Sequence, residues 1–208
     1  MSDNNAFFCN QTIKPASKRY KMESVAERDL INRIRSGEPG AFSGLLRQHQ
    51  HTVYSLIVQM VSSREDAEEL TQDVFVKAYQ KIGSFRGESA IATWLYRIAY
   101  NTAISAVRKK KPMFTVLDEK TMYDVPDEVV DEVLNRDHDE NMLQSIQQAI
   151  AQLHPDEKAL ISLYYTQGRT LKEVASIMNL SGGNAKIKLF RIRKKIVRII
   201  RQTQNGPR

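Results

Sequence analysis

The spacing of the apolar residues constrains this chain most strongly, because it follows the 3.6-residue period of an α-helix. Between residues 40 and 61 the apolar side chains recur at intervals of three, four and seven, and similar stripes follow in 63–82, 93–111, 139–153 and 182–201. Such intervals place apolar side chains on one helix face, whereas a half-buried strand needs strict alternation. Alternation of that kind is nearly absent. The sequence therefore predicts an all-α protein.

The charge distribution divides the chain into two domains. Residues 112–140 contain ten acidic and two basic residues, a net charge of −8, which leaves +15 for the rest of a chain whose total is +7. This acidic stretch includes Pro112, Pro126 and only scattered apolar residues, so we expect a flexible linker with at most short helical pieces and little to pack. The sequence thus predicts helical domains at 23–111 and 139–202, an acidic linker at 112–138, and tails at 1–22 and 203–208.

The N-terminal residues carry no targeting signal. Residues 1–20 lack the apolar core of a secretory signal, and no apolar run in the chain approaches the roughly 20 residues that span a membrane. The single cysteine, Cys9, cannot form an internal disulfide, and a plain free thiol is the simplest interpretation. We expect no membrane insertion and a reducing, cytoplasmic location.

The C-terminal domain contains the pattern of a helix-turn-helix. Thr170 and Glu173 form a capping box that opens a short helix, 179–181 makes a turn, and a long helix follows from 182 to 201. Residues 185–201 carry eight cations and no acid: Lys186, Lys188, Arg191, Arg193, Lys194, Lys195, Arg198 and Arg201. A solvated cationic helix is the alternative. Because the second helix of this motif enters the major groove of DNA, we expect it to bind duplex DNA.

A second nucleic-acid surface is predicted in the first domain. Arg97, Asn101 and Arg108 recur at helical spacing, and the helix leads into a basic run at 108–111. An asparagine can recognise a base edge and aromatic rings can stack on unpaired bases, so this face suits strand-separated DNA. Trp94 and Tyr96 are expected in the core or at its edge rather than on bases.

The helix predicted at 63–82 has an acidic outer face formed by Glu65, Asp66, Glu69, Gln72 and Asp73. Such a surface repels DNA and suits a basic groove on a protein partner, although a merely solvated face fits the charges equally well.

No constellation typical of an enzyme is present in the sequence. His49 and His51 lie two residues apart, on different sides of a helix, and His138 and His154 have no neighbouring ligand pattern. No metal motif, catalytic triad or phosphate-binding loop is found. We predict no catalytic residue, no metal and no cofactor.

Three stretches of the first domain resemble a known family. DAEELTQDVFVKAY at 66–79, FRGES at 85–89 and TWLYRIAYN at 93–101 resemble region 2 of the extracytoplasmic-function (ECF) sigma factors, group IV of the sigma-70 superfamily. Residues 153–195 resemble region 4 of the same family. The resemblance spans nearly everything from 25 to 201.

This resemblance implies a sigma factor that binds core RNA polymerase, recognises minus-35 and minus-10 promoter elements and promotes strand opening. Docking on the β′ clamp helices is implied for Asp66, Glu69, Gln72 and Asp73, with the β subunit as a further contact. Minus-10 recognition is implied for Ser84, Phe85, Arg86, Glu88, Ser89, Ala90, Arg97, Asn101 and Arg108. Minus-35 recognition is implied for Asn184, Lys186, Ile187, Lys188, Phe190 and Arg191.

The resemblance also implies a regulatory partner and a place in the cell. Small sigma factors of this kind are commonly held inactive by an anti-sigma protein, so we expect such a partner in the bacterial cytoplasm, with the complex held at the membrane where that partner is anchored. The acidic linker would run toward the RNA exit path of the polymerase.

Two positions depart from the family pattern. Many relatives open the recognition helix with Gly-Thr-Val, whereas residues 183–188 read GNAKIK, and Ile187 cannot form a hydrogen bond. Base preference should therefore differ and rest more on DNA shape. Asn179 stands in the turn where glycine is common.

The alternative to a sigma factor is a stand-alone helix-turn-helix regulator that binds operator DNA without core polymerase. It accounts only for the second half of the chain, and binding to core polymerase discriminates between the two.

Overall fold

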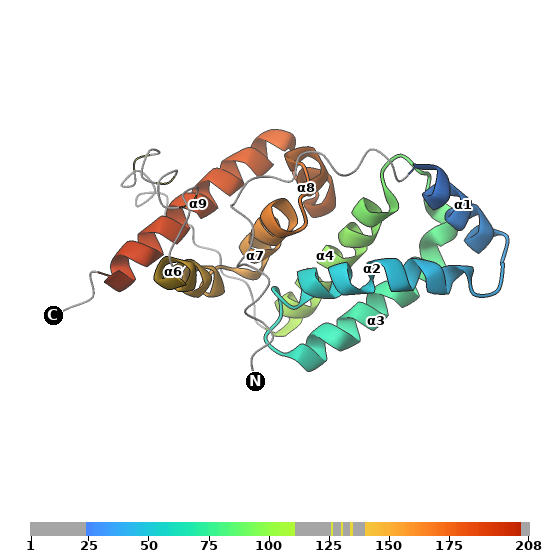
Figure 1. Cartoon of the computed structure of the whole chain (residues 1–208), viewed down its shortest axis with the longest axis horizontal. Coiled ribbons are helices and arrows are strands. Elements are labelled where there is room, and N and C mark those ends of the chain that lie inside the picture. The colour runs from blue at the N-terminus through green and yellow to red at the C-terminus, as the bar shows by residue number, and fades with distance from the viewer. Residues whose placement is uncertain (1–23, 111–125, 127–129, 131–133, 135–139, 205–208) are drawn as a thin grey trace.

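The computed structural model describes residues 24–110, 126, 130, 134 and 140–204 (Figure 1). Within these residues the regular elements are all helical, which confirms the predicted fold class. The predicted N-terminal tail and most of the predicted linker lie outside the described residues. Of the predicted C-terminal tail, residues 203 and 204 are described and 205–208 are not. The helices form two groups that lie side by side in Figure 1, with α4 and α7 at their junction.

The first group packs around a single apolar core. It comprises α1 (Ser24–Arg35), α2 (Ala41–Ile57), α3 (Arg64–Lys81), the 3₁₀ turn η1 (Ile82–Ser84) and α4 (Ile91–Lys110). Leu45 and Leu56 of α2, Val74 of α3, and Leu95 and Ala99 of α4 are almost completely buried. These residues belong to the stripes expected from the sequence, because a 3.6-residue period brings them to the face that each helix turns toward its neighbours.

Local signals set the helix boundaries of this group. Gly40 precedes α2 with φ of 79°, a left-handed conformation that glycine adopts without strain. The Ser63 hydroxyl accepts a 3.1 Å hydrogen bond from the Asp66 N–H, which satisfies one of the free donors at the start of α3.

The second group contains the helix-turn-helix. It comprises α6 (Glu140–Ala151), α7 (Pro155–Ile161), a π-helical turn (Ser162–Thr166), α8 (Leu171–Met178) and α9 (Gly182–Gln204). The capping box predicted at Thr170 and Glu173 is present at the start of α8. Asn179 ends α8 in the left-handed conformation with φ of 56°, as expected of an asparagine that replaces glycine in this turn.

One face of α9 is anchored to α7. Leu189, Ile192 and Ile196 are buried, which confirms the apolar stripe predicted in 182–201. Lys195 Nζ lies 2.7 Å from Glu157 Oε2, and the Glu157 side chain is almost fully buried. A buried carboxylate needs hydrogen bonds or a partner of opposite charge, and Glu157 has both, since it also accepts a 2.8 Å hydrogen bond from the His154 N–H; its ion pair with Lys195 links α9 to α7.

The linker prediction is wrong at two positions. Val130 and Leu134, the described apolar residues of this stretch, are each only 3% exposed and belong to the hydrophobic core. The expectation of little packing came from the density of acidic residues. Two apolar side chains four residues apart fall on one helix face and can pack together even in an acidic stretch.

Candidate nucleic-acid and polymerase interfaces

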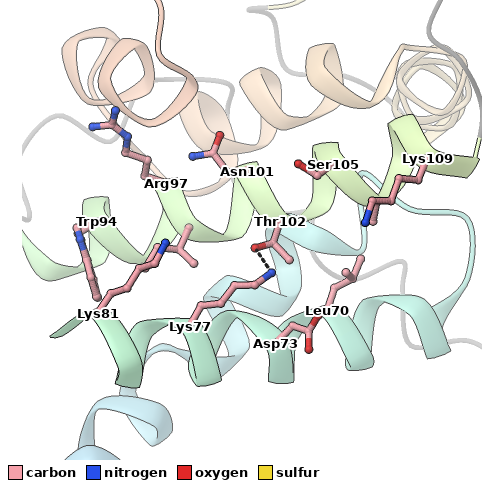
Figure 2. Close-up of a pocket in the computed structure, with 12 residues that line it drawn as sticks. Leu70, Asp73, Lys77, Lys81, Trp94, Arg97, Asn101, Thr102, Ser105 and Lys109 are labelled. Atoms are coloured by element: carbon pink, nitrogen blue, oxygen red, sulfur yellow. Dashed lines mark hydrogen bonds between the residues drawn. The ribbon is translucent and has the colours of Figure 1, made fainter.

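A groove of about 520 Å³ lies between α3 and α4, and it contains two of the predicted minus-10 residues, Arg97 and Asn101. Figure 2 shows both side chains on the outer side of α4, away from the α3 backbone. Trp94, at the edge of the core as predicted, also lines the groove. The other lining residues are Leu70, Asp73, Lys77, Lys81, Ile98, Thr102, Ser105, Ala106 and Lys109.

The groove is cationic. Lys77, Lys81, Arg97 and Lys109 contribute four positive charges against the single carboxylate of Asp73. Lys77 Nζ donates a 3.2 Å hydrogen bond to the Thr102 hydroxyl, which holds this lysine between α3 and α4 (Figure 2). Cations can bind the phosphates of a single strand, while a partly exposed indole and an asparagine can contact its bases. This combination is typical of sites for single-stranded nucleic acid.

Lys109 belongs to the basic run predicted at 108–111, but sequence reasoning missed two cations of this groove, Lys77 and Lys81. The sequence shows that Lys77 and Lys81 lie four residues apart, but pairs with this spacing are common on exposed helix faces and do not by themselves indicate a binding groove. Only the packing of α3 against α4 brings them to the same groove as Arg97.

The loop before α4 presents most of its predicted residues to solvent. Ser84, Arg86, Glu88 and Ser89 are exposed and Ala90 is partly buried. Arg86 and Glu88 form an exposed ion pair at 3.9 Å, which contributes little to stability.

Phe85 does not have the exposed position that was expected for it in the DNA-contacting loop. Its side chain is only 5% exposed, its ring packs 5.4 Å from that of Trp94, and its carbonyl accepts a hydrogen bond from Arg35 of α1. The aromatic ring gains more from burial beside Trp94 than from exposure in a polar loop. Phe85 therefore supports the loop from beneath and does not offer its ring to DNA.

Arg108 and Tyr100 lie apart from the groove. Arg108 is exposed on α4 but is not among the lining residues. Tyr100 is buried, and burial together with the Asp156 carboxylate of α7 raises the pKa of its hydroxyl. Its ring is therefore not available to stack on bases.

The predicted acidic surface of α3 is Asp66, Glu69, Gln72 and Asp73. Glu69, Gln72 and Asp73 are exposed, as docking on a protein requires. Lys110 Nζ lies 2.6 Å from Asp66 Oδ2, and its hydrogen bond lowers the pKa of that carboxyl group. Asp73 also borders the cationic groove, so the acidic surface and the groove are contiguous.

The predicted minus-35 residues divide into two sets on α9. Asn184, Lys186, Ile187 and Phe190 are exposed and Arg191 is partly exposed. Lys188 instead forms an ion pair with Asp156 of α7. Burial tends to raise the pKa of Asp156, but the hydrogen bond and charge of Lys188, with those of His154, outweigh it and hold the pKa below its usual value. Lys188 therefore fixes α9 on α7.

The two groups of helices meet where α4 contacts α7 and α8. The Tyr96 hydroxyl donates a 2.8 Å hydrogen bond to Gln167 Oε1, and the Thr93 hydroxyl lies 3.3 Å from Glu173 Oε1. The Arg169 guanidinium, only 3% exposed, lies over the Tyr96 ring and 3.5 Å from the Glu173 carboxylate. We call these five residues the domain interface.

His49 of α2 lies close to this interface. Its side chain is 8% exposed, and burial together with the nearby Arg169 charge lowers its pKa to about 4. His49 is therefore neutral at physiological pH.

Two features are absent from the part of the chain that the structure describes. No group of three or more His, Cys, Asp or Glu side chains there could hold a metal ion. In the same part of the chain, the search for a helix that could cross a membrane found none.

Comparison with known proteins identifies both halves. The sequence profile of sigma-70 region 2 matches residues 45–112, and that of sigma-70 region 4 matches residues 143–196. The chain is 34% identical to the ECF RNA polymerase sigma-E factor of Haemophilus influenzae over 180 residues, which cover 84% of this chain and 95% of that protein. It is 30% identical to the RNA polymerase sigma-H factor of Pseudomonas aeruginosa over 176 residues, covering 82% and 91%.

Solved structures share the fold. CnrH, determined in complex with the cytosolic domain of CnrY, matches with a TM-score of 0.56 and 20% identity over 82% of this chain and 94% of that one. The sigma factor RpoE of Bartonella quintana, determined with the anti-sigma factor NepR, matches with a TM-score of 0.56 and 22% identity over 78% and 98%. Two sigma-70 regions in order on one helical fold, with sigma factors as full-length relatives, do not favour a stand-alone regulator. The chain belongs to the extracytoplasmic-function sigma factors, the subunits that direct RNA polymerase to promoters and promote the initiation of transcription.

Proposed function

We propose that this sigma factor divides its work among three surfaces: the acidic surface of α3 docks on core polymerase, the groove between α3 and α4 holds the melted minus-10 strand, and α9 binds the minus-35 duplex. The observation that carries the proposal is the groove, which four cations, Trp94 and Asn101 line beside the exposed acidic surface of α3.

The acidic surface suits the β′ clamp helices because it is exposed and of a sign that repels DNA. Glu69, Gln72 and Asp73 would contact the polymerase. Asp66 would contribute less, because Lys110 already neutralises it. Docking here would place the adjoining groove at the DNA that the polymerase opens.

The groove would hold non-template DNA. Asn101 can form two hydrogen bonds with a base edge, and the four cations can bind successive phosphates. The exposed loop residues Ser84, Arg86, Glu88 and Ser89, with Ala90, would cover a flipped base, and Arg108 would bind the strand beyond the groove. Flipping a base costs a few kcal/mol of stacking, which contacts in a preformed pocket can offset.

The exposed residues of α9 would enter the major groove of the minus-35 element. Asn184 and Ile187 lie in its N-terminal half, where a recognition helix contacts bases, and Lys186 and Arg191 would add base or phosphate contacts. Lys188 would act indirectly, since its ion pair with Asp156 sets the angle of α9.

The two domains must separate to bind both promoter elements. Elements about 25 base pairs apart are roughly 85 Å apart at about 3.4 Å per base pair. In the structure α4 contacts α8 and α8 contacts α9, which at about 8–10 Å per helix pair separates α4 from α9 by only about 20 Å. A linker at 112–138 can reach about 90 Å when extended, so it allows this separation once Val130 and Leu134 leave the core. The arrangement in which the two domains are in contact, which we call the closed structure, would therefore precede promoter binding.

An anti-sigma protein is the proposed inhibitor. The relative from Bartonella quintana was determined with an anti-sigma factor, and its fold matches this chain. Such a partner could act by keeping the two domains together. We place the protein in the bacterial cytoplasm, held at the membrane where its inhibitor is anchored, and assign it no catalytic activity of its own.

The test is reconstitution of the full chain with core polymerase at low salt. We expect co-elution in gel filtration and initiation at defined promoters that core alone does not use. Binding of duplex DNA by the chain, without association with core, would contradict the proposal and support a stand-alone regulator.

A further inference from the structure

The exposed face of α9 has Ile187 near its centre, among polar and cationic neighbours. Ile187 is 51% exposed, while Ala185, Leu189 and Ile192 on the opposite face are buried. Asn184, Arg191 and Lys194 share the face of Ile187, because they lie three, four and seven residues from it. An isoleucine in this position neither stabilises the core nor neutralises a phosphate.

Phe190 is placed differently. It is 39% exposed, but Lys194 Nζ lies 4.5 Å from the centroid of its ring, so a cation partly covers this ring. Phe190 lies at the side of the exposed face, while Ile187 is near its centre. Ile187 is therefore the apolar side chain that α9 presents most directly.

The charges around Ile187 define its partner. Arg191, Lys194 and Arg198 continue the same face toward the C-terminus without an acidic residue, which suits a polyanion rather than an apolar protein surface. In the major groove of duplex DNA the C5-methyl group of thymine is the distinctive apolar feature of the base edges. An apolar side chain between Asn184 and Arg191 would meet such a methyl group when its neighbours contact base edges and phosphates.

We propose that Ile187 selects thymine in the minus-35 element by packing against its C5-methyl group. This inference rests on the proposed function of α9 and gives that surface a base preference. It replaces the expectation that recognition depends mainly on DNA shape with a direct apolar contact, while Asn184 supplies a neighbouring hydrogen bond.

The test removes only the methyl group. A promoter found with the reconstituted holoenzyme is synthesised with each thymine of its minus-35 element replaced in turn by deoxyuridine, which keeps every hydrogen-bonding group. At one or two positions we expect the holoenzyme to bind roughly fourfold more weakly, the loss that corresponds to one buried methyl group.

The matched variants assign the effect to Ile187. Ile187→Ala should bind the thymine and deoxyuridine promoters equally, whereas Lys186→Ala should weaken both and keep their ratio. Ile187 is exposed, so the alanine variant should fold normally, and its circular dichroism spectrum checks this.

Several results would overturn the inference. They are a minus-35 element without thymine, equal binding of every deoxyuridine promoter by the wild-type holoenzyme, or an Ile187→Ala variant that keeps the thymine preference. Loss of a protein partner in Ile187→Ala with unchanged thymine preference would assign the residue to a protein contact instead. Failure of the holoenzyme to initiate at any promoter would reject the proposed function itself, and a sigma factor that initiates normally but ignores the methyl group would reject only this inference.

Discussion

The guanidinium carbon of Arg169 lies 5.0 Å from the centroid of the Tyr96 ring, and this contact joins the two sigma regions. Arg169 precedes α8, whereas Tyr96 belongs to α4. Glu173 pairs with the same arginine and lies within hydrogen-bonding distance of Thr93. Burial tends to raise the pKa of Glu173, but its hydrogen bonds from Thr170 and the Arg169 charge outweigh this effect, so the carboxylate stays ionised.

Replacement of Arg169 should separate the domains. Arg169→Ala removes the stacked cation and leaves Glu173 without its ion pair, so the interface should weaken by a few kcal/mol. Small-angle X-ray scattering should then show a larger radius of gyration than the wild type. Lys172→Ala, an exposed residue of α8, should leave it unchanged. An Arg169→Ala protein that folds normally and remains as compact as the wild type would show that the contact does not hold the domains together.

Acidification should destabilise the closed structure through His49. Its pKa of about 4 in the folded protein is below the ordinary value of 6.5, so the unfolded chain takes up the proton first. The contribution of His49 to the free energy of unfolding is therefore complete above about pH 6.5 and is lost as the pH falls toward 4. This contribution amounts to about 3 kcal/mol. Urea unfolding of wild type and His49→Gln across this range measures it.

The control for this titration is His51, an exposed histidine of the same helix. His51→Gln should keep the wild-type pH dependence, while His49→Gln should flatten it. Identical slopes in all three proteins would exclude His49 as the source.

Charge reversal on α3 should abolish polymerase docking. Glu69→Lys with Asp73→Lys should prevent co-purification with core polymerase, because two cations would replace the carboxylates that we assign to the docking face. Asp29→Lys with Glu140→Lys makes the same change of charge at exposed positions of α1 and α6 and should have no effect. Intact co-purification of the α3 variant would remove this assignment.

Asn101→Ala should impair strand opening more than duplex binding, because Asn101 lines the groove that we assign to the melted strand. Permanganate footprinting of unpaired thymines measures opening, and a gel-shift assay measures closed-complex formation. Asn141→Ala, at an exposed position of α6, serves as the control. Equal losses in the two assays would argue against a base-holding role.

Loss of cations from α9 should reduce the salt dependence of promoter binding. Lys186→Ala with Arg191→Ala should weaken minus-35 binding and lower the slope of log K against log salt by about 1 for each phosphate contact removed. Core binding should be unaffected. Arg28→Ala with Lys172→Ala makes an equal change of charge elsewhere, and an equal effect from that pair would indicate non-specific electrostatics.

The helices could be predicted from the sequence because the period of the apolar residues, the capping residues and the glycines determine where a helix forms and ends through local interactions. The seam of Leu189, Ile192 and Ile196, the capping box at Thr170 and the left-handed Asn179 all follow from residues within one or two helical turns. The candidate groove was only half predictable. Arg97 and Asn101 share one helix, but Lys77 and Lys81 reach them only through the packing of α3 on α4.

The remaining differences have a tertiary cause. Phe85 was expected at the DNA surface because its loop resembles the minus-10-binding loop of the family, yet the ring packs beside Trp94 and its carbonyl is held by Arg35. Lys188 was expected on DNA because it lies in a basic run, yet Asp156 on another helix neutralises it. The domain interface had no visible sequence signal, since Arg169 and Tyr96 are 73 positions apart.

Photo-crosslinking tests most directly the claim that one sigma factor binds DNA through two separate surfaces. A photoreactive amino acid at Ser105 in the α3–α4 groove, or at Lys186 on α9, is introduced into the full chain and assembled with core polymerase on a promoter. We predict that position 105 crosslinks to the non-template strand of the minus-10 element and position 186 to the minus-35 duplex of the same complex. Crosslinks from both positions to a single duplex segment, independent of core polymerase, would contradict the account.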